Sequence, residues 1–316
     1  MKHLFIINPT SGGKSHDPNK TAELIEAAMK GSSENYEIYF TKAPMDACEK
    51  IRQDVASGEE LRVYGCGGDG TFNECVNGAA LLPNVAVTQF PCGTGNDFIR
   101  MFGDEADSFR DFNNLICGET RKLDIIKCND RYSVNICSVG IDARVGLDVH
   151  KYSKIPLIGG ATGYIVSTVV NVLKGINSSY SITTEYGTVD GEFAMVCACN
   201  GRYYGGGFNP VPEAMPDDGL MDVLIVKSVK LTSLPGILGK YAKGRYRELS
   251  KYIKHIKTTE IEIKSEKELE VNIDGEALYT DDVIFEIIPD GLNFICPQGL
   301  KFWDKNKEKR SSDENI

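Results

Sequence analysis

Residues 61–78 read LRVYGCGGDGTFNECVNG, and this stretch decides the fold class. The apolar run LRVY predicts a short buried strand, GCGGDG predicts a glycine-rich turn, and the residues from Thr71 onward predict a helix. A strand that ends in such a turn and passes directly into a helix is typical of open α/β sheets, which bind ligands at the carboxyl ends of their strands. The turn is therefore a candidate anion site.

The same alternation of strand and helix extends over the first part of the chain. Helices are predicted near 20–29, 45–56 and 71–81, and strands for HLFIIN, YEIYFT, LRVYGC and NVAVTQF. Such βαβα order implies a parallel sheet covered by helices. We therefore expect an α/β nucleotide-binding domain over residues 1–124, with 290–305 as a candidate addition to it.

From about Lys122 the pattern becomes rich in strands. They are predicted for KLDIIKC, YSVNIC, YSITTEY, EFAMVCACN, MDVLIVK, TTEIEIK, LEVNID and VIFEII, with helices near 160–173 and 231–244. A second, mainly antiparallel domain over 125–289 follows, and 306–316 reads as a polar tail. The predicted fold class is thus α/β plus β.

The amino-acid composition excludes some classes of function. The formal net charge of −10 over 316 residues argues against general nucleic-acid binding, which relies on Lys and Arg. The ten cysteines form no CxxC pair, and the apolar run near the start is too short for a signal peptide, so a cytoplasmic protein with reduced thiols is expected. The uncharged segment 155–173 approaches the length of a membrane span, but its glycines and polar residues favour a buried or pocket-lining helix.

Two glycine-rich turns of the sequence resemble familiar phosphate-binding motifs, but neither meets all the requirements of its motif. GCGGDG fits the dinucleotide pattern G-x-G-x-x-G, but it follows the third predicted strand, and the next strand ends without the acidic residue that would bind a ribose. NPTSGGKS at 8–15 ends like a Walker A loop, but Asn8 replaces its first glycine. What remains is a strand-end turn with Lys14 nearby as a point charge for phosphate.

A third turn, PCGTGNDFIR at 91–100, completes the set. Three such turns on neighbouring parallel strands would converge on one crevice, which favours a nucleotide polyphosphate site over three independent turns. Asp69 and Asp97 in these turns offer the oxygen ligands that Mg²⁺ prefers.

The motifs NPTSGG, GGDGTFNECVNG and PCGTGNDFIR, in this order and spacing, resemble the diacylglycerol kinase catalytic domain family, which includes sphingosine kinases and bacterial soluble lipid kinases. DDGLMDV at 217–223 and NIDGEAL at 272–278 extend the resemblance over most of the chain. NAD kinases and phosphofructokinases share GGDGT but not the whole set. The resemblance implies a phosphotransferase that uses ATP and Mg²⁺ to phosphorylate a lipid hydroxyl, with diacylglycerol as leading acceptor and phosphatidic acid as product.

The resemblance also implies roles for individual residues. The nucleotide would be bound by Asn8, Thr10, Lys14, Gly67, Gly68, Asp69, Gly70, Thr71, Thr94 and Asn96. The catalytic base would belong to the D-G-E turn, at Asp274 with Glu276 as its neighbour, although LEVNIDGEAL alone favours a structural hairpin turn.

Metal ligands are implied at two places. Asp124, in an apolar strand, would join Asp69 and Asp97 in an active-site Mg²⁺ network, and its alternative is a solvent-facing carboxylate. Bacterial relatives hold a structural divalent ion at a position that maps to Asp218 and the Leu220 carbonyl. A metal-free turn is the alternative there.

A lipid substrate must be reached at a membrane surface. The stretch Lys240–Lys257 is rich in Lys and Arg, with Glu248 as its one acid, and suits peripheral contact with anionic lipid or a plain solvated surface. Segment 155–173 is a candidate wall of an acyl-chain pocket. A sphingoid base or other lipid alcohol, a soluble acceptor of an NAD kinase-like enzyme, a regulatory module without activity, and a homodimer are left open.

Overall fold

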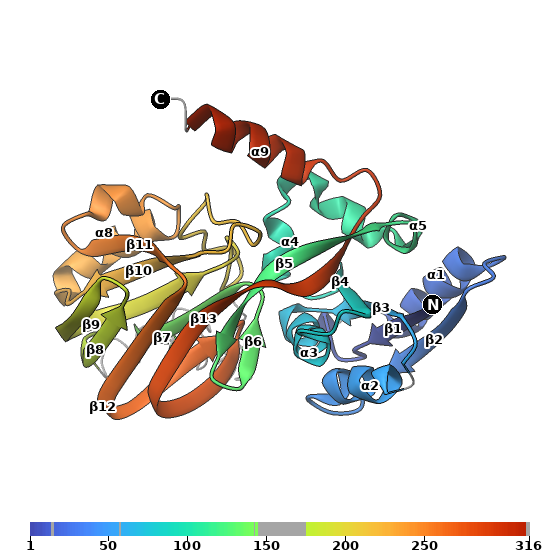
Figure 1. The fold of residues 1–316 in the computed structure, drawn as a ribbon, viewed down its shortest axis with the longest axis horizontal. Coiled ribbons are helices and arrows are strands. Elements are labelled where there is room, and N and C mark those ends of the chain that lie inside the picture. The colour runs from blue at the N-terminus through green and yellow to red at the C-terminus, as the bar shows by residue number, and fades with distance from the viewer. Residues whose placement is uncertain (14–15, 57, 142, 145–174, 314–316) are drawn as a thin grey trace. The chain divides into compact units, whose positions relative to one another are not determined.

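The computed structural model describes residues 1–13, 16–56, 58–141, 143–144 and 175–313, and the chain divides into two compact units (Figure 1). Unit 1 comprises Met1–Leu123 and Gly291–Ile316, and unit 2 comprises Asp124–Asp290. Each boundary differs by one residue from the one expected from sequence. Lys14 and the segment 155–173 lie outside the described residues.

Unit 1 is built on parallel strands. These are β1 (Lys2–Ile7), β2 (Asn35–Phe40), β3 (Leu61–Gly67) and β4 (Val85–Pro91), in the spatial order β2-β1-β3-β4. Each neighbouring pair runs parallel, and Asn293 and Phe294 near the end of β13 add a parallel pairing beside β4. Their short apolar runs are buried on both faces in β1, β3 and β4, as expected for a sheet covered by helices.

The predicted helices of unit 1 are confirmed. They are α1 (Pro18–Met29), α2 (Asp46–Val55) and α3 (Asp69–Ala79), followed by the short α4 (Asp97–Arg100), the 3-10 helix η2 (Gly103–Arg110) and α5 (Phe112–Ile116). Asp17 shows why α1 starts where it does, because its side chain accepts the N–H groups of Asn19 and Lys20 and Pro18 follows it.

The C-terminal return completes the core of unit 1. Phe294 packs edge-to-face against Phe98 at a ring-centroid distance of 5.5 Å, and Phe302 contacts Phe102 at 4.9 Å. Phe302 opens α9 (Phe302–Asp313), so the segment predicted as a polar tail is helical as far as Asp313. Sequence polarity after residue 304 concealed this helix, which is anchored by its buried first residues.

Unit 2 is mainly antiparallel, as predicted. Its strands are β5 (Glu119–Cys128, beginning in unit 1), β6 (Arg131–Ser133), β7 (Ile136–Gly140), β8 (Ser178–Thr184), β9 (Gly187–Cys199), β10 (Met221–Lys227), β11 (Ile253–Thr258), β12 (Glu260–Ile273) and β13 (Glu276–Cys296, ending in unit 1). The order is β11-β10-β9-β7-β12-β13, with β8 paired to β9 and β12. The predicted helix near 231–244 is η3 (Leu231–Ser233) with α8 (Leu234–Tyr241), and η4 (Tyr246–Leu249) follows.

Strand β9 explains the continuous apolar run FAMVCAC. Val196 and Ala198 pack into one hydrophobic cluster, whereas Cys197 and Cys199 pack into another. A strand buried on both faces needs no alternation of polar and apolar residues. Among the described residues, no helix has the length and apolar character to span a membrane.

Two strand predictions were wrong. TTEIEIK and LEVNID, expected as separate strands, both lie mostly within the single strand β12. YSVNIC was expected to be a single strand, but β6 ends at Ser133 and β7 begins at Ile136. Val134 and Asn135 bend between them, because hydrogen bonds from Ser133, Val134 and Ile136 converge on the distant Asp274. No local pattern announces a partner this far away in the sequence.

Candidate active site

The first turn is tied to the second by Asn8. Its backbone N–H donates to the Cys66 carbonyl at 3.0 Å, and its side-chain amide donates to Thr71 Oγ1 at 2.9 Å. The Asn8 Oδ1 atom accepts both the N–H and the hydroxyl of Thr10, at 3.0 and 2.8 Å. Asn8 and Thr10 therefore hold the turn against the first turn of α3.

The second turn presents the start of α3. Gly68 is the N-cap residue and supplies no capping side chain, and its own N–H donates to Ser11 Oγ at 3.2 Å. Helix amides without a side-chain cap, together with the helix dipole, attract anions. The first-turn residues Gly70 and Thr71 belong to this uncapped helix start. Gly67 is required beside them because a Cβ atom there would lie 2.3 Å from Thr71 Oγ1.

Asp69 fastens the third turn to the second. Its Oδ2 accepts the Asn96 N–H at 2.8 Å and its Oδ1 accepts the Asp97 N–H at 2.6 Å. Burial raises the pKa of Asp69, and these hydrogen bonds act in the opposite direction. Asn96 can turn toward this carboxylate because it adopts a left-handed conformation, with φ of 52°.

The Asn96 side chain also holds the third turn through hydrogen bonds to Gly93 and Gln89. Asn96 Oδ1 accepts the Gly93 N–H at 3.1 Å, and the Asn96 side-chain amide donates to the Gly93 carbonyl at 2.7 Å. Gln89 donates to the same Oδ1 at 3.2 Å. The Asn96 side chain therefore positions the turn, whereas Thr94 is exposed at its tip.

Glycines in these turns allow the backbones to touch one another. A Cβ atom on Gly93 would lie 2.4 Å from Gly68 Cα, and one on Gly95 would lie 2.4 Å from Asp69 Oδ2. A Cβ atom on Gly12 would lie 2.3 Å from the Cys92 carbonyl oxygen. The predicted convergence of the three turns is confirmed, with the glycines serving contact between turns.

Asp69 and Asp97 form the part of the expected metal network that lies in unit 1. Asp97 is buried, its N–H binds Asp69, and its Oδ1 lies 3.4 Å from Arg100 Nε. Two adjacent carboxylates at a phosphate-binding turn fit a hard cation such as Mg²⁺, whose remaining ligands are usually waters and phosphate oxygens.

Asp124 lies in unit 2 and binds the turn at Gly219 and strand β13 at Asp290. One of its carboxylate oxygens accepts the Gly219 N–H at 2.7 Å and the other accepts the Asp290 N–H at 3.0 Å. Its side chain is buried, and burial raises its pKa. These contacts give the carboxylate a structural role, and the solvent-facing alternative is excluded.

The acidic turn between β12 and β13 contains Asp274 and Glu276. The Asp274 carboxylate accepts the Ser133 hydroxyl at 2.6 Å, the Ile136 N–H at 2.8 Å and the Val134 N–H at 3.0 Å. Asp274 has φ of 50°, so the turn is tight as well as clamped. Glu276, the first residue of β13, is exposed.

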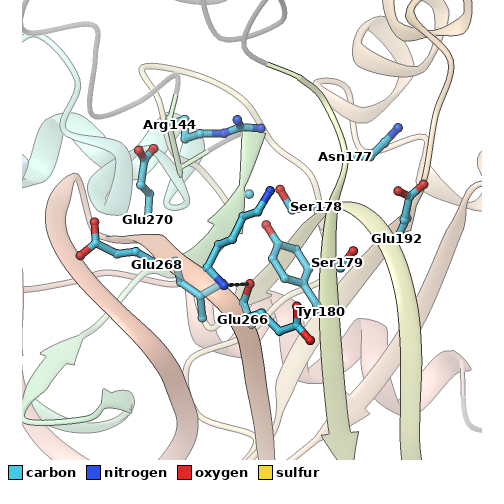
Figure 2. Close-up of a pocket in the computed structure, with 13 residues that line it drawn as sticks. Arg144, Asn177, Ser178, Ser179, Tyr180, Glu192, Glu266, Glu268 and Glu270 are labelled. Atoms are coloured by element: carbon cyan, nitrogen blue, oxygen red, sulfur yellow. Dashed lines mark hydrogen bonds between the residues drawn. The ribbon is translucent and has the colours of Figure 1, made fainter.

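Unit 2 also contains a polar pocket that the sequence analysis did not identify. Its volume is about 410 Å³, and Figure 2 shows glutamates of the β12 segment on one side and Tyr180 with Glu192 on the other. Arg144 lines it and donates to the Gly175 carbonyl at 2.7 Å. The alternation in EKELE, which places Glu266, Glu268 and Glu270 on one face of a strand, was the available signal.

The basic stretch Lys240–Lys257 is partly neutralised by ion pairs. Arg245 Nε lies 2.6 Å from Glu248 and Lys240 Nζ lies 3.2 Å from the same carboxylate. Arg247 pairs with Glu213 at 2.6 Å. The positive charge of this stretch is therefore smaller than its sequence suggests.

Comparisons with known proteins agree with this architecture. The model of the diacylglycerol kinase catalytic domain matches residues 2–128, and that of the YegS C-terminal NAD kinase beta sandwich-like domain matches residues 135–296. The chain is 30% identical over 304 residues to a protein of Shewanella frigidimarina named "Probable lipid kinase YegS-like", with 94% of each chain covered.

A solved structure agrees with both matches. The chain superposes on the crystal structure of a diacylglycerol kinase from Bacillus anthracis with a TM-score of 0.69 and 25% identity, covering 95% of this chain and 98% of that one. The two matched domains together span most of the described chain, and the curated relative spans nearly all of it. The chain therefore belongs to the diacylglycerol kinase catalytic domain family, together with the YegS-like lipid kinases.

Proposed function

We propose that this member of the lipid kinase family transfers the γ-phosphoryl group of ATP to the free hydroxyl of diacylglycerol in a Mg²⁺-dependent reaction. The observation that carries the proposal is the three-turn assembly of unit 1, in which Asp69 joins two turns beside the uncapped start of α3. Such an assembly suits phosphate groups and a hard cation together.

The nucleotide phosphates bind the amides of Gly70 and Thr71, while Asn8, Thr10 and Asn96 keep the turns in place. Asp69 and Asp97 would hold Mg²⁺, which would supply charge neutralisation at the phosphates. Because the turns are fixed to each other before nucleotide arrives, little reorganisation is needed during the reaction.

The acidic turn supplies the proton acceptor. The different contacts of Asp274 and Glu276 indicate which of the two has this role. Three donors already stabilise the charge of Asp274, and such hydrogen bonding makes a carboxylate a weaker base. Glu276 is exposed two residues later. We therefore assign proton acceptance to Glu276 and positioning of the turn to Asp274, which exchanges the roles expected from resemblance.

The lipid hydroxyl oxygen forms a bond to the γ-phosphorus, the bond between that phosphorus and the bridging oxygen of ADP breaks, and the hydroxyl proton passes to Glu276. ADP leaves with the electron pair of the broken bond.

The test is transfer of labelled γ-phosphate from ATP and Mg²⁺ to lipids in mixed micelles. Glu276→Gln should lower kcat by roughly 10²–10⁴-fold, the usual contribution of a general base, with nucleotide affinity unchanged. Asp274→Asn should lower both kcat and thermal stability, because it weakens the clamp on the segment 133–136. Asp281→Asn, an exposed acid on the same strand β13, is the control.

The outcomes separate the elements of the proposal. Full activity of Glu276→Gln with loss confined to Asp274→Asn would return the base to Asp274. Transfer only to another lipid would retain the kinase and change its acceptor. Absence of lipid transfer alongside tight nucleotide binding would contradict the proposed function.

A second acceptor class is favoured by the polar pocket of unit 2. Glu192, Glu266, Glu268 and Glu270 line it together with Arg144 and Lys267, so four acidic side chains face two basic ones. An acidic lining suits the ammonium group of a sphingoid base better than the neutral head of diacylglycerol. The lipid panel should therefore include a sphingoid base.

A further inference from the structure

Lys257 on β11 lies between two carboxylates. Its Nζ atom is 3.0 Å from Asp218 Oδ2 and 3.5 Å from Asp222 Oδ2. The Asp222 side chain is 1% exposed, and its other oxygen is 2.7 Å from His255 Nε2. One ammonium group thus bridges two carboxylates that are largely withdrawn from water.

Asp218 belongs to the turn at which a structural divalent ion was expected. Its Oδ1 accepts the Leu220 N–H at 3.2 Å and its Oδ2 accepts the ammonium of Lys257. A divalent ion coordinated by this carboxylate would lie close to that ammonium and be repelled by it. The residues at this turn therefore do not fit the ion.

We propose that Lys257 supplies, from within the chain, the positive charge expected at Asp218 from a divalent ion, so that this turn is held without a metal. Asp222 and Asp218 compensate for the desolvation of the ammonium: burial alone lowers the pKa of Lys257, but the two carboxylates raise it overall, and Lys257 stays charged at neutral pH. Removal of the ammonium leaves two carboxylates close together with no charge between them.

The turn that Lys257 holds through Asp218 also contacts Asp124. Gly219, next to Asp218, has φ of +73° and donates its N–H to Asp124 Oδ2 at 2.7 Å. Lys257 fixes Asp218, and Asp218 shares its turn with the residue that binds Asp124. Lys257 on β11 therefore helps to position the buried carboxylate of Asp124 on β5.

The test uses the full chain without nucleotide and measures bound metal and Tm, in EDTA and in excess Mg²⁺ or Ca²⁺. The wild type should carry no divalent ion that is lost in Asp218→Asn, and any ion bound through Asp69 and Asp97 should be unaffected by that substitution. Lys257→Met should lower Tm in EDTA by a few degrees, because the ammonium is 40% exposed and solvent screens part of its attraction to the two carboxylates, and Ca²⁺ should restore part of that loss. Lys254→Met, at an exposed position on the same strand, should change Tm little.

Two results would overturn the proposal. One is a wild-type chain that carries one equivalent of divalent ion and loses it in Asp218→Asn. The other is a Lys257→Met chain as stable in EDTA as Lys254→Met. If Lys257→Met does not fold, the metal content of the wild type and of Asp218→Asn decides. Neither readout involves phosphate transfer, so this proposal and the proposed function fail separately.

Discussion

At the scale of single residues, Asp69 is the position where one atom matters most. Each of its oxygens accepts a backbone N–H of the third turn, at 2.8 and 2.6 Å. Asp69→Asn would replace one acceptor by an NH₂ donor facing an N–H group. We expect a loss of about 1–3 kcal/mol in the free energy of unfolding, typical of a buried donor left without an acceptor, and a large loss of nucleotide affinity.

Urea unfolding and nucleotide titration of Asp69→Asn check this expectation. Asp107→Asn is the matched control, because the Asp107 side chain is 94% exposed in the same unit. Wild-type stability together with wild-type nucleotide affinity in Asp69→Asn would show that the third turn holds its position without this carboxylate.

At the scale of elements, an ion-pair network joins β1, β2 and α2. Lys2 Nζ lies 2.6 Å from Glu37 and 2.8 Å from Asp54, and Lys50 Nζ lies 2.8 and 2.9 Å from the same two carboxylates. Burial alone would raise the pKa of Glu37 and Asp54, but the two lysines outweigh it and lower the pKa of both.

The sign of these shifts predicts a pH dependence. A carboxyl whose pKa is lower in the folded chain stabilises it above its unfolded pKa, 4.5 for Glu and 3.8 for Asp here, and this stabilisation is lost as pH falls through the folded value. The thermal stability of unit 1 should therefore decrease below about pH 4. In Asp54→Asn the slope of Tm against pH should be shallower, and a slope equal to that of the wild type would refute the prediction.

Elements also show what sequence could predict. Strands β1, β3 and β4 are short apolar runs closed by turns, so local pattern sufficed for them and for the helices between them. The break between β6 and β7 was missed because it depends on Asp274, far along the chain. The candidate turns were found from their glycines, but the glycines were expected to admit a ligand, and they serve the approach of one backbone to another.

At the scale of the whole molecule, the chain is negatively charged, whereas the basic stretch Lys240–Lys257 is positively charged. The chain has a formal charge of −10, so attraction to an anionic membrane must come from a local surface. Ion pairs already occupy Lys240, Arg245 and Arg247. The exposed Lys243, Lys251 and Lys254 of the basic stretch are the residues that we propose for membrane contact.

Substitution of these three lysines by Glu should therefore weaken binding to vesicles that contain anionic phospholipid. At about 1 kcal/mol per basic residue near the surface, the loss should be roughly a hundredfold at low salt and smaller at physiological salt. A variant with Glu at the exposed Lys20, Lys30 and Lys42 of unit 1 has the same net charge and isolates the effect of position. Cosedimentation with anionic and with zwitterionic vesicles measures both. Equal losses in the two variants would mean that net charge alone governs binding, and salt-independent binding would exclude an electrostatic contact, because only screened charges respond to ionic strength.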